Sequence, residues 1–351
     1  MPTFARTVLA PITVEVAAGA LGRLPELLVD SRISSGGRVA VALGPGLGET
    51  IAAELDHLPG ATVHTVRPGT LASARDLASR LRDDHRVDAL VGIGGGKLLD
   101  TAKWAATDLG LPMVAVATSL AHDGLASPTA SLEREGVSVS YGVHPPLAVL
   151  ADLDFIRGAP AAQLRSGVGD ALTNLSAVAD WRLSHEVNGE PVDGLAAAIS
   201  RTGAEAVLRH PGTIGDDDFL ATLADALIQG GLASSMAGSS RPCSGGCHEI
   251  SHALDVLHPG LASHGEQGAL GALVCTWLRG DEALFGELSA AMARHGLPRT
   301  AEALGLSLAE LAAAVAYAPR TRPGRYTILE HRELDSVALE RHLTEMMHEL
   351  D

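Results

Sequence analysis

Three histidines close together in the sequence carry its clearest chemical signal. His248 and His252 are four positions apart, and His264 follows sixteen positions after His248. Residues four apart share one face of a helix, so the first two imidazoles can point in one direction. Ser263 and Glu266 fit the S-x-x-E form of a capping box, which predicts that His264 lies in the first turn of the next helix. Neutral nitrogen ligands from two helices suit a divalent metal ion; the alternative is that these are scattered polar residues of ordinary helices.

The composition limits the class of protein. A chain of 351 residues is long enough for two domains, and its 46% apolar residues and 39 glycines suit a globular α/β protein. Lysine and arginine number 26 against 42 acidic residues, a formal charge of −16, so no nucleic-acid partner is expected. The three cysteines form no disulfide framework, and the chain shows neither a signal pattern nor an apolar run of about 18 residues. We therefore expect a cytoplasmic protein without membrane insertion.

The order of apolar runs predicts the fold class. Strand-like runs alternate with helical stretches in the first part of the chain, which indicates a Rossmann-like, doubly wound parallel sheet. The expected strands cover 13–16, 38–43, 61–66, 88–93, 112–117 and 147–150, and the expected helices cover 21–28, a segment through Leu55, 71–81 and 97–110. After Gly158-Ala159-Pro160 the periodicity is helical, with helices expected over 170–185, 193–208, 217–233, 249–257 and 266–278. We predict an α/β N-terminal domain (1–157) and an all-α C-terminal domain (158–351).

A glycine-rich turn follows the strand that ends at Ile93. Gly94, Gly95 and Gly96 lie between this strand and the helix that begins near Lys97. Glycine lets backbone N–H groups approach a phosphate closely, and a helix N-terminus favours negative charge, so the turn suits a dinucleotide pyrophosphate. A plain tight turn is the alternative, since the first βα turn of an ordinary Rossmann fingerprint lies earlier in a chain.

A polar loop follows the next expected strand. Thr118, Ser119 and Ser127 offer hydroxyls to a cofactor, and Asp123 offers a carboxylate to a substrate hydroxyl. The loop leaves the carboxyl edge of the sheet, where doubly wound proteins bind ligands. The alternative is a polar loop closed by its Asp-Gly turn.

Asp170 is the candidate oxygen ligand for the histidines. It lies in the stretch SGVGDALTN, at the expected start of a helix. Two histidines and one carboxylate, with positions left for water or substrate, are a common catalytic metal set. Alternatively, Asp170 stabilises the N-terminus of its helix.

Six stretches of the chain occur together, in the same order, in one known family. They are GGGKLLDTAK, ATSLAHDGLASP, SGVGDALTN, SRPCSGGCHEISHALD, SHGEQ and RPGRYTIL. Over about residues 10 to 330 the chain resembles the sn-glycerol-1-phosphate dehydrogenases, a branch of the group that includes iron-containing alcohol dehydrogenases, glycerol dehydrogenases and dehydroquinate synthases. The resemblance implies a dehydroquinate synthase-like architecture, with a Rossmann-like domain, a helical domain and one metal, usually Zn²⁺, in the cleft between them.

The resemblance also implies roles for individual residues. The metal ligands would be Asp170, His248 and His264, whereas His252 would lie beside the substrate. His252 and Asp123 would be catalytic, and both would contact the substrate together with Asp170. The cofactor would be lined by Gly94, Gly95, Gly96, Lys97, Asp100, Thr118, Ser119, Leu120, Ala121 and Ser127.

The implied reaction reduces dihydroxyacetone phosphate to sn-glycerol 1-phosphate. The metal acts as a Lewis acid on the C2 oxygen, and reduced nicotinamide delivers hydride to C2. The alkoxide is then protonated through His252 or a bound water. Arg241, Arg322 and Arg325 are candidates for binding the substrate phosphate, or else ordinary surface arginines.

Several finer properties stay open. Gly44 and Arg67 occupy the strand ends where an acidic residue would bind a ribose 2′-hydroxyl, so NAD or NADP fits, with a slight lean towards NADP. Fe²⁺ and Ni²⁺ accept the same ligands as Zn²⁺, and Cys247, a departure from the family beside His248, could compete as a soft ligand. The other functions considered are a dehydrogenase of another phosphorylated or unphosphorylated polyol, a dehydroquinate synthase-like sugar-phosphate cyclase and a non-catalytic nucleotide-binding protein. A homo-oligomer is expected, because members of this group usually self-associate.

Overall fold

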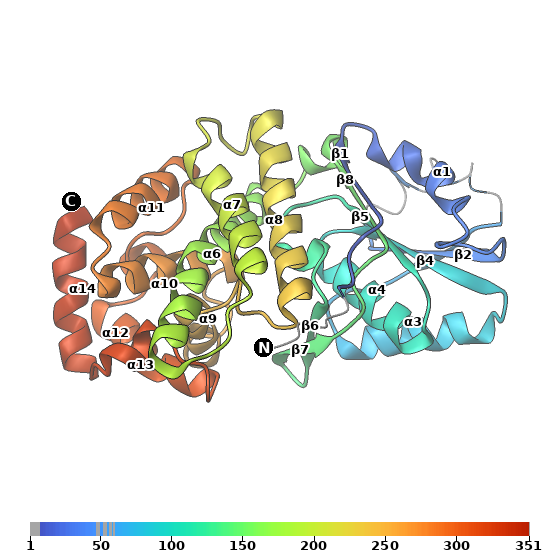
Figure 1. Cartoon of the computed structure of the whole chain (residues 1–351). Coiled ribbons are helices and arrows are strands. Elements are labelled where there is room, and N and C mark those ends of the chain that lie inside the picture. Colours follow the sequence, from blue (N-terminus) through green and yellow to red (C-terminus); the bar gives the residue numbers. More distant parts are fainter. Residues whose placement is uncertain (1–7, 47–49, 52–54, 56–57, 59, 351) are drawn as a thin grey trace, which may run out of the picture. The chain divides into compact units, whose positions relative to one another are not determined.

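The computed structural model describes all residues except 1–7, 47–49, 52–54, 56–57, 59 and 351. The chain divides into two compact units between Pro160 and Ala161, whereas the sequence placed the boundary between residues 157 and 158. Figure 1 shows an α/β unit in the first part of the chain and a helical unit in the second. The helix expected through Leu55 lies largely outside the described residues.

A six-stranded parallel sheet forms the centre of the N-terminal unit. Its strands, in the spatial order β1-β8-β5-β4-β2-β3, are β1 (Thr13–Ala17), β8 (Ala148–Asp152), β5 (Met113–Ala117), β4 (Val87–Gly94), β2 (Arg38–Leu43) and β3 (Thr62–Thr65). All neighbouring strands pair in parallel. β5 and β8 are buried at every residue, as parallel strands covered on both faces are, which is why they appear as apolar runs rather than as alternations. The predicted fold class is confirmed.

The helices of this unit connect the strands. They are η1 (Ala20–Arg23), α1 (Leu24–Leu28), α3 (Leu71–Asp83), α4 (Gly96–Leu109), η2 (Asp123–Leu125) and α5 (Leu153–Ile156). The buried residues of α3 recur at helical spacing, so one face packs inwards. Thr70 caps α3 by accepting from the Ser73 amide at 3.1 Å. α4 contacts α3, β4 and β5, and it carries the glycine-rich turn at its N-terminus.

The strand order reverses at β2 and β4, and this reversal defines a ligand-binding edge. From β2 the chain moves outwards to β3, crosses back over β2 to β4, and continues on the other side to β5. The connections after β2 and β4 therefore leave in opposite directions, which opens a crevice at the carboxyl ends of these strands. β2 ends before Gly44, and β4 ends at Gly94, the first glycine of the predicted turn. The turn thus lies at the topological switch point.

An antiparallel hairpin outside the main sheet was not predicted. It consists of β6 (Thr129–Arg134) and β7 (Val137–Gly142). Glu135 and Gly136 join the strands with φ values of 56° and 82°, which are typical of a type I′ turn. The sequence signal was a Glu-Gly pair between two segments with alternating side chains, which a search for fully apolar strands overlooks.

The C-terminal unit is helical, and no strand occurs among its described residues. Its elements are α6 (Ala161–Asn188), α7 (Gly194–Arg209), α8 (Asp217–Ala237), α9 (Gly246–Leu257), α10 (His264–Arg279), α11 (Glu282–His295), η3 (Glu302–Leu304), α12 (Leu308–Tyr317), η4 (Ala318–Thr321), α13 (Ile328–Arg332) and α14 (Ser336–Leu350). α10 packs against both α6 and α9 and is buried along most of its length. These three helices carry the predicted metal ligands.

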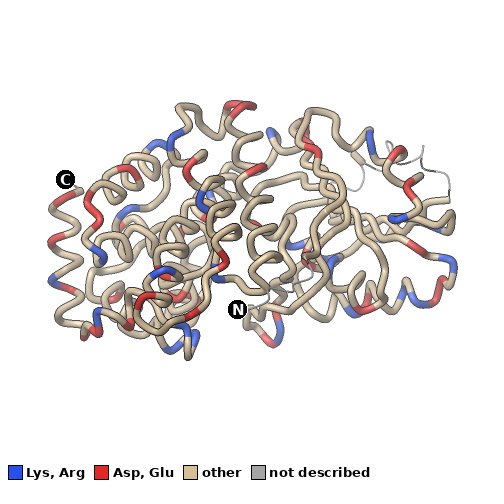
Figure 2. The backbone as a smooth tube through the Cα atoms, in the orientation of Figure 1, with Lys and Arg blue, Asp and Glu red and all other residues tan. Residues whose placement is uncertain are grey.

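Charged side chains are distributed along both units. Figure 2 shows acidic and basic residues interspersed on the surface helices, so the net negative charge is not confined to one segment. Among aspartate, glutamate, lysine and arginine, α10 has only Glu266 and Arg279, in agreement with its central position in the helical unit. Across the residues that the structure describes, no helix combines the length and apolarity needed to cross a membrane.

Candidate functional site

Asp170 on α6, His248 on α9 and His264 at the start of α10 bring their side chains together. Nε2 of His248 lies 3.5 Å from Oδ1 of Asp170, and Nε2 of His264 lies 3.8 Å from the same oxygen. One ligand atom from each residue lies within 4.8 Å of the others. Ligands about 2.1 Å from a tetrahedral Zn²⁺ are separated by about 3.4 Å, so the donor types and spacing fit one divalent ion.

Two glycines let the helices approach closely enough to bring these ligands together. A Cβ on Gly169, the neighbour of Asp170, would lie 2.1 Å from the carbonyl oxygen of Gly265. A Cβ on Gly265, the neighbour of His264, would lie 1.8 Å from the carbonyl oxygen of Ser166. Both distances are far inside van der Waals contact, so a side chain at either position would push α6 and α10 apart.

Further glycines continue this close packing along α10. A Cβ on Gly268 would lie 2.9 Å from a methyl carbon of Thr173, and one on Gly271 would lie 2.5 Å from the carbonyl oxygen of Cys247. With Gly265, these residues recur every three positions and face α6 and α9. Glycines three positions apart are the signal in the sequence that α10 packs closely on both neighbours. This signal was overlooked in the prediction from sequence.

A capping box determines where α10 begins. Ser263 Oγ accepts from the Glu266 amide at 3.4 Å, and Glu266 Oε2 accepts from the Ser263 amide at 3.0 Å. The predicted cap is confirmed, and His264 is the first helical residue. Its Nδ1 lies 3.3 Å from Ser251 Oγ, which donates to Gln267 Oε1 at 2.8 Å. Contacts of this kind orient the ring and leave Nε2 directed at the ligand group.

Asp170 lies in the middle of α6, which begins at Ala161 rather than at the expected residue 170. The alternative that Asp170 stabilises a helix N-terminus is therefore wrong. Gly167 and Gly169 made the segment look like a helix start, but they lie inside the helix. Asp170 is only 5% exposed, and burying a carboxylate is costly unless a positive partner compensates.

His248 is buried and has a neighbouring thiol. Burial disfavours the imidazolium, but Cys247 and Asp170 outweigh this effect and raise the pKa of His248 above its usual value. A metal ion competes with that proton for the ring nitrogen. Cys247 Sγ lies 3.4 Å from His248 Nδ1 and donates to the Thr173 carbonyl at 3.7 Å, and it is outside the group of converging ligand atoms.

His252 lies beside the ligand group. Its ring centroid is 6.2 Å from that of His264, and its Nε2 accepts a hydrogen bond from Arg322 Nη2 at 3.0 Å. Burial, and then the nearby charge of Arg322, lower the pKa of His252 to about 3. The ring is therefore neutral, and because Nε2 is the acceptor, its proton is on Nδ1. The predicted position of His252 beside the substrate stays a prediction.

The glycine-rich turn begins at the carboxyl end of β4. Gly94 ends the strand, Gly95 is the N-cap of α4, and Gly96 and the exposed Lys97 are its first residues. No side chain of the described part of the chain caps this helix, so its first N–H groups suit a pyrophosphate. A Cβ on Gly96 would lie 2.2 Å from Nε2 of His122, so internal packing also requires glycine here.

The loop after β5 is joined to this turn. The Thr118 amide donates to the Gly94 carbonyl at 3.1 Å, and Ser127 Oγ donates to the Thr129 carbonyl at 3.3 Å. Ser119 is 3% exposed, and its hydroxyl has no partner among the described residues. A buried hydroxyl without a partner calls for a ligand or water. The residues of this edge therefore fit a dinucleotide.

Asp123 opens the short helix η2. His122 caps it, with Nδ1 accepting from the Gly124 amide at 3.0 Å. Leu120 is fully buried, and Ala121 and Asp123 are half-buried. The segment is therefore held by packing and by a cap, with the Asp123 carboxylate at a partly exposed position.

Asp100 and Lys103 form a buried ion pair on α4, with Nζ 2.9 Å from Oδ1. Lys103 Nζ also donates to the carbonyls of Gly124 and Thr129 at 2.8 and 2.5 Å, and Asp100 Oδ2 accepts from the Ser131 amide at 3.0 Å. One carboxylate and two carbonyls surround this compact ammonium group, which explains a lysine here in a chain otherwise rich in arginine. Asp100 is thus engaged in positioning η2 and β6.

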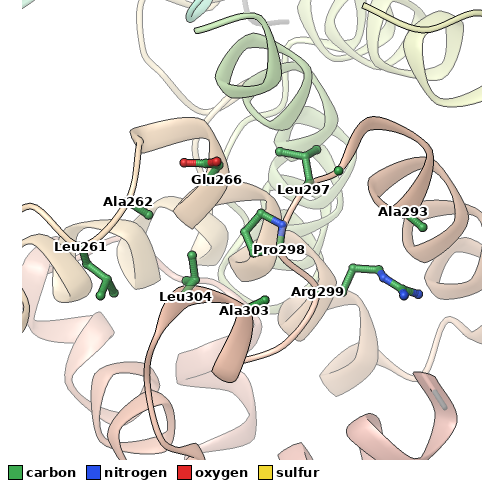
Figure 3. A pocket seen from close by; sticks show the side chains of 10 residues that line it. Leu261, Ala262, Glu266, Ala293, Leu297, Pro298, Arg299, Ala303 and Leu304 are labelled. Atoms are coloured by element: carbon green, nitrogen blue, oxygen red, sulfur yellow. The ribbon is translucent and has the colours of Figure 1, made fainter. Parts of the chain in front are cut away.

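A hollow of about 470 Å³ in the C-terminal unit is lined by both apolar and charged residues. Its lining residues are Leu261, Ala262, Glu266, Ala293, Gly296, Leu297, Pro298, Arg299, Ala303 and Leu304 (Figure 3). Glu266 is used in the capping box, and Arg299 donates to Ser289 Oγ at 3.1 Å. None of the predicted ligands lines this hollow.

Comparison with known proteins shows which class combines such a parallel sheet with a helical unit that carries a candidate metal site. The sequence profile of the iron-containing alcohol dehydrogenases matches residues 15–160. Among solved structures, a probable glycerol dehydrogenase from Sinorhizobium meliloti superimposes with a TM-score of 0.77, covering 99% of both chains at 23% identity. The chain therefore has the fold of the metal-dependent alcohol dehydrogenases.

Curated relatives identify the family within this class. The chain is 36% identical over 335 residues to the glycerol-1-phosphate dehydrogenase (NAD(P)+) of Staphylothermus marinus, covering 93% of this chain and 94% of the relative. It is also 36% identical over 319 residues to the enzyme of the same name from Pyrococcus furiosus, covering 89% and 91%. The chain belongs to the glycerol-1-phosphate dehydrogenase family, which confirms the resemblance found in the sequence.

Proposed function

We propose that the protein is a metal-dependent, NAD(P)H-linked oxidoreductase that reversibly reduces dihydroxyacetone phosphate to sn-glycerol 1-phosphate. The convergence of Asp170, His248 and His264 carries the proposal, because it occurs in a chain whose relatives are glycerol-1-phosphate dehydrogenases. The reaction moves a hydride to C2 and a proton to the C2 oxygen.

Asp170, His248 and His264 would hold one divalent metal ion, which we propose to be Zn²⁺. The chemistry that such an ion supplies is Lewis-acid polarisation of the substrate carbonyl. Two imidazoles and one carboxylate leave coordination positions for water or substrate. Asp170 and His248 are buried, whereas His264 has a 40% exposed side chain, so the group is open on the His264 side.

The edge of the N-terminal sheet would hold the nicotinamide cofactor, which supplies or accepts the hydride. The N–H groups at the start of α4 would donate to the pyrophosphate, and the unpartnered hydroxyl of Ser119 would bond the cofactor. The proposed cofactor contacts are Gly94, Gly95, Gly96, Lys97, Asp100, Thr118, Ser119, Leu120, Ala121 and Ser127. Asp100 would affect cofactor binding indirectly, by positioning η2 and β6. Its two oxygens already contact Lys103 Nζ and the Ser131 amide.

His252 and Asp123 would hydrogen-bond the substrate and help to supply the proton for the C2 oxygen. His252 is neutral with its proton on Nδ1, so it is a hydrogen-bond donor at that atom while Nε2 is held by Arg322. Asp123 would accept from a substrate hydroxyl, and Asp170 would contact the substrate beside the metal. His252 would donate a hydrogen bond from Nδ1 to a bound water, and this water would give the proton to the C2 oxygen and regain one from solvent.

The test follows NADH and NADPH absorbance with protein that has been stripped by a chelator and reloaded with Zn²⁺, Fe²⁺ or Ni²⁺. Oxidation of the cofactor with dihydroxyacetone phosphate, lost on chelation and restored best by Zn²⁺, is the expected result. The reverse reaction with each glycerol phosphate enantiomer checks the stereochemistry, and only sn-glycerol 1-phosphate should reduce the cofactor.

Other outcomes would contradict the proposal. Reduction of a different ketone, without activity on dihydroxyacetone phosphate, would assign another polyol substrate. Turnover of a sugar phosphate without net change in the cofactor would indicate a cyclase. Full activity after complete removal of metal would exclude the metal-dependent mechanism.

A further inference from the structure

The three candidate arginines for binding phosphate are buried or half-buried and have different electrostatic surroundings. Arg241 is 5% exposed and forms an ion pair with Glu190 at 2.5 Å. It also donates to the Tyr326 carbonyl at 3.0 Å. Because its charge is neutralised by a carboxylate within the fold, Arg241 is a structural residue, and it leaves the set of candidates for binding a substrate phosphate.

Among the described residues, Arg322 and Arg325 donate only to neutral hydrogen-bond acceptors. Both donate to Ser240 Oγ, at 3.2 and 3.1 Å. Arg322 also donates to His252 Nε2, and Arg325 donates to the Ser244 carbonyl. In the part of the chain that the structure describes, neither guanidinium forms an ion pair with a carboxylate. Two like charges therefore converge on one serine hydroxyl.

This arrangement is electrostatically incomplete. Burial lowers the pKa of both arginines, and attraction to Glu249 opposes this effect only in part. At Arg325, repulsion from Arg322 and then Arg241 adds to the effect of burial and outweighs the attraction to Glu249 and Glu190, so its pKa falls to about 10. Buried positive charges are costly unless an anion compensates. Ser244 adds a buried hydroxyl that has no partner among the described residues.

We infer that Arg322 and Arg325, together with Ser240, bind the phosphate group of the substrate. This inference rests on the proposed function and specifies its substrate contacts. Guanidinium groups present planar pairs of donors that match phosphate oxygens, and such charge-assisted hydrogen bonds are stronger than neutral ones. A phosphate ester supplies the ion-pair partner that neither arginine has among the described residues.

His252 lies between Arg322 and the metal ligand candidate His264. This ring lies 6.2 Å from the His264 ring and accepts from Arg322 at 3.0 Å. In dihydroxyacetone phosphate, one carbon and one ester oxygen separate the carbonyl carbon from phosphorus, so a carbonyl at the ligand group places the phosphate one side chain away. Arg322 is thus also a positioning residue, because it holds the ring orientation of His252.

The kinetic test compares kcat/KM for dihydroxyacetone phosphate with kcat/KM for unphosphorylated dihydroxyacetone. In Arg325→Gln, the ratio of the two values should fall about 10- to 100-fold, the effect of losing charged hydrogen bonds. Arg322→Gln should lower the ratio similarly and also lower kcat, because His252 loses its donor. Arg320→Gln changes an exposed arginine two positions from Arg322 and should leave the ratio at the wild-type value.

A binding test is independent of turnover. Isothermal calorimetry with inorganic phosphate and chelated, full-length protein should show binding that weakens at least tenfold in the Arg322→Gln/Arg325→Gln double variant. Arg320→Gln should bind phosphate as the wild type does. If the glutamine variants do not fold, Arg325→Lys replaces them, since it keeps the charge but loses the paired donors.

Equal phosphate affinity in the double variant and the wild type, or no phosphate binding by the wild type, would overturn the inference. An unchanged specificity ratio in Arg325→Gln would overturn it as well. Phosphate binding that depends on these arginines, in a protein that does not reduce dihydroxyacetone phosphate, would support the subsite and reject only the proposed reaction.

Discussion

The two functional regions of this molecule are built by different means. In the N-terminal unit, the region after β4 and β5 consists of glycines, a helix N-terminus and short hydroxyl residues, so main-chain groups would make many of the contacts. In the C-terminal unit, Asp170, His248 and His264 extend from three helices, and each is defined by its side chain. The first region depends on the path of the backbone, and the second depends on residue identity and on the distance between helices.

The two regions also treat buried charge differently. Asp100 and Lys103 neutralise each other on α4, and their remaining polar atoms bond the protein itself. Arg322 and Arg325 have no such partner among the described residues. The ion pair of Asp100 and Lys103 positions a loop. Arginines without an ion-pair partner are suited to binding an anionic ligand. The following predictions separate the two regions experimentally.

The largest expected effect comes from the histidines of the helical unit. His248→Ala should lose the metal and reduce kcat/KM at least about a thousandfold, because one of three ligands is removed. His252→Ala should keep the metal, as measured by elemental analysis, and lower turnover. If His252→Ala loses the metal as readily as His248→Ala, their division of roles is wrong. NADH binding, followed by fluorescence, should persist in both.

Gly265→Ala should move α10 away from α6. Its Cβ would lie 1.8 Å from the Ser166 carbonyl oxygen, so we expect a loss of about 3 kcal/mol in unfolding free energy and a metal affinity about 100-fold lower. Gly286→Ala is the matched control, because no atom of the described residues lies within 4 Å of a Cβ at that position on α11. It should be neutral or slightly stabilising. Equal denaturation midpoints for the two variants would contradict the packing explanation.

Lys103→Met should act on the N-terminal region alone. It leaves Asp100 buried without its cation, which costs about 3 kcal/mol and releases the carbonyls of Gly124 and Thr129. Thermal unfolding should occur at lower temperature, and the Kd for NADH should rise, while metal content stays at the wild-type value. Lys97→Met, at an exposed position, should change the unfolding free energy by less than about 0.5 kcal/mol. Loss of metal from Lys103→Met would show that the regions are not separable.

The smallest effect concerns His295, which is buried on α11 and stacks on Phe219 at 4.5 Å. Burial, and then the charges of Arg294 and His210, lower its pKa to about 4. Because the unfolded chain binds a proton more readily than the folded one, its contribution to stability is present above pH 6.5. It is lost progressively as the pH falls from 6.5 towards 4.

His295→Phe should flatten that decline in denaturant titrations between pH 7 and pH 4. Metal content at pH 7 should match that of the wild type, since the change lies outside the ligand group. A parallel decline in the variant and the wild type would assign the acid sensitivity to other groups.

Local patterns in the sequence predicted most elements of both units. The strands of the parallel sheet and the capping box of Ser263 and Glu266 were found because their signals extend over only a few neighbouring residues. The hairpin of β6 and β7 was missed, although the turn at Glu135 and Gly136 carried a readable signal. The start of α6 was placed too late, because glycines required for helix contact look like helix breakers in isolation.

The sequence by itself determined the fold class, the family and the residue types able to hold a metal, since these depend on periodicity and on short motifs. Only the tertiary structure decided that Asp170 lies within a helix rather than at its cap. It also decided that Arg241 forms an ion pair with Glu190 and that Lys103 donates to backbone carbonyls. These properties depend on partners many positions away in the chain. Contacts between distant residues follow from the packing of whole helices and strands, and no local pattern encodes them.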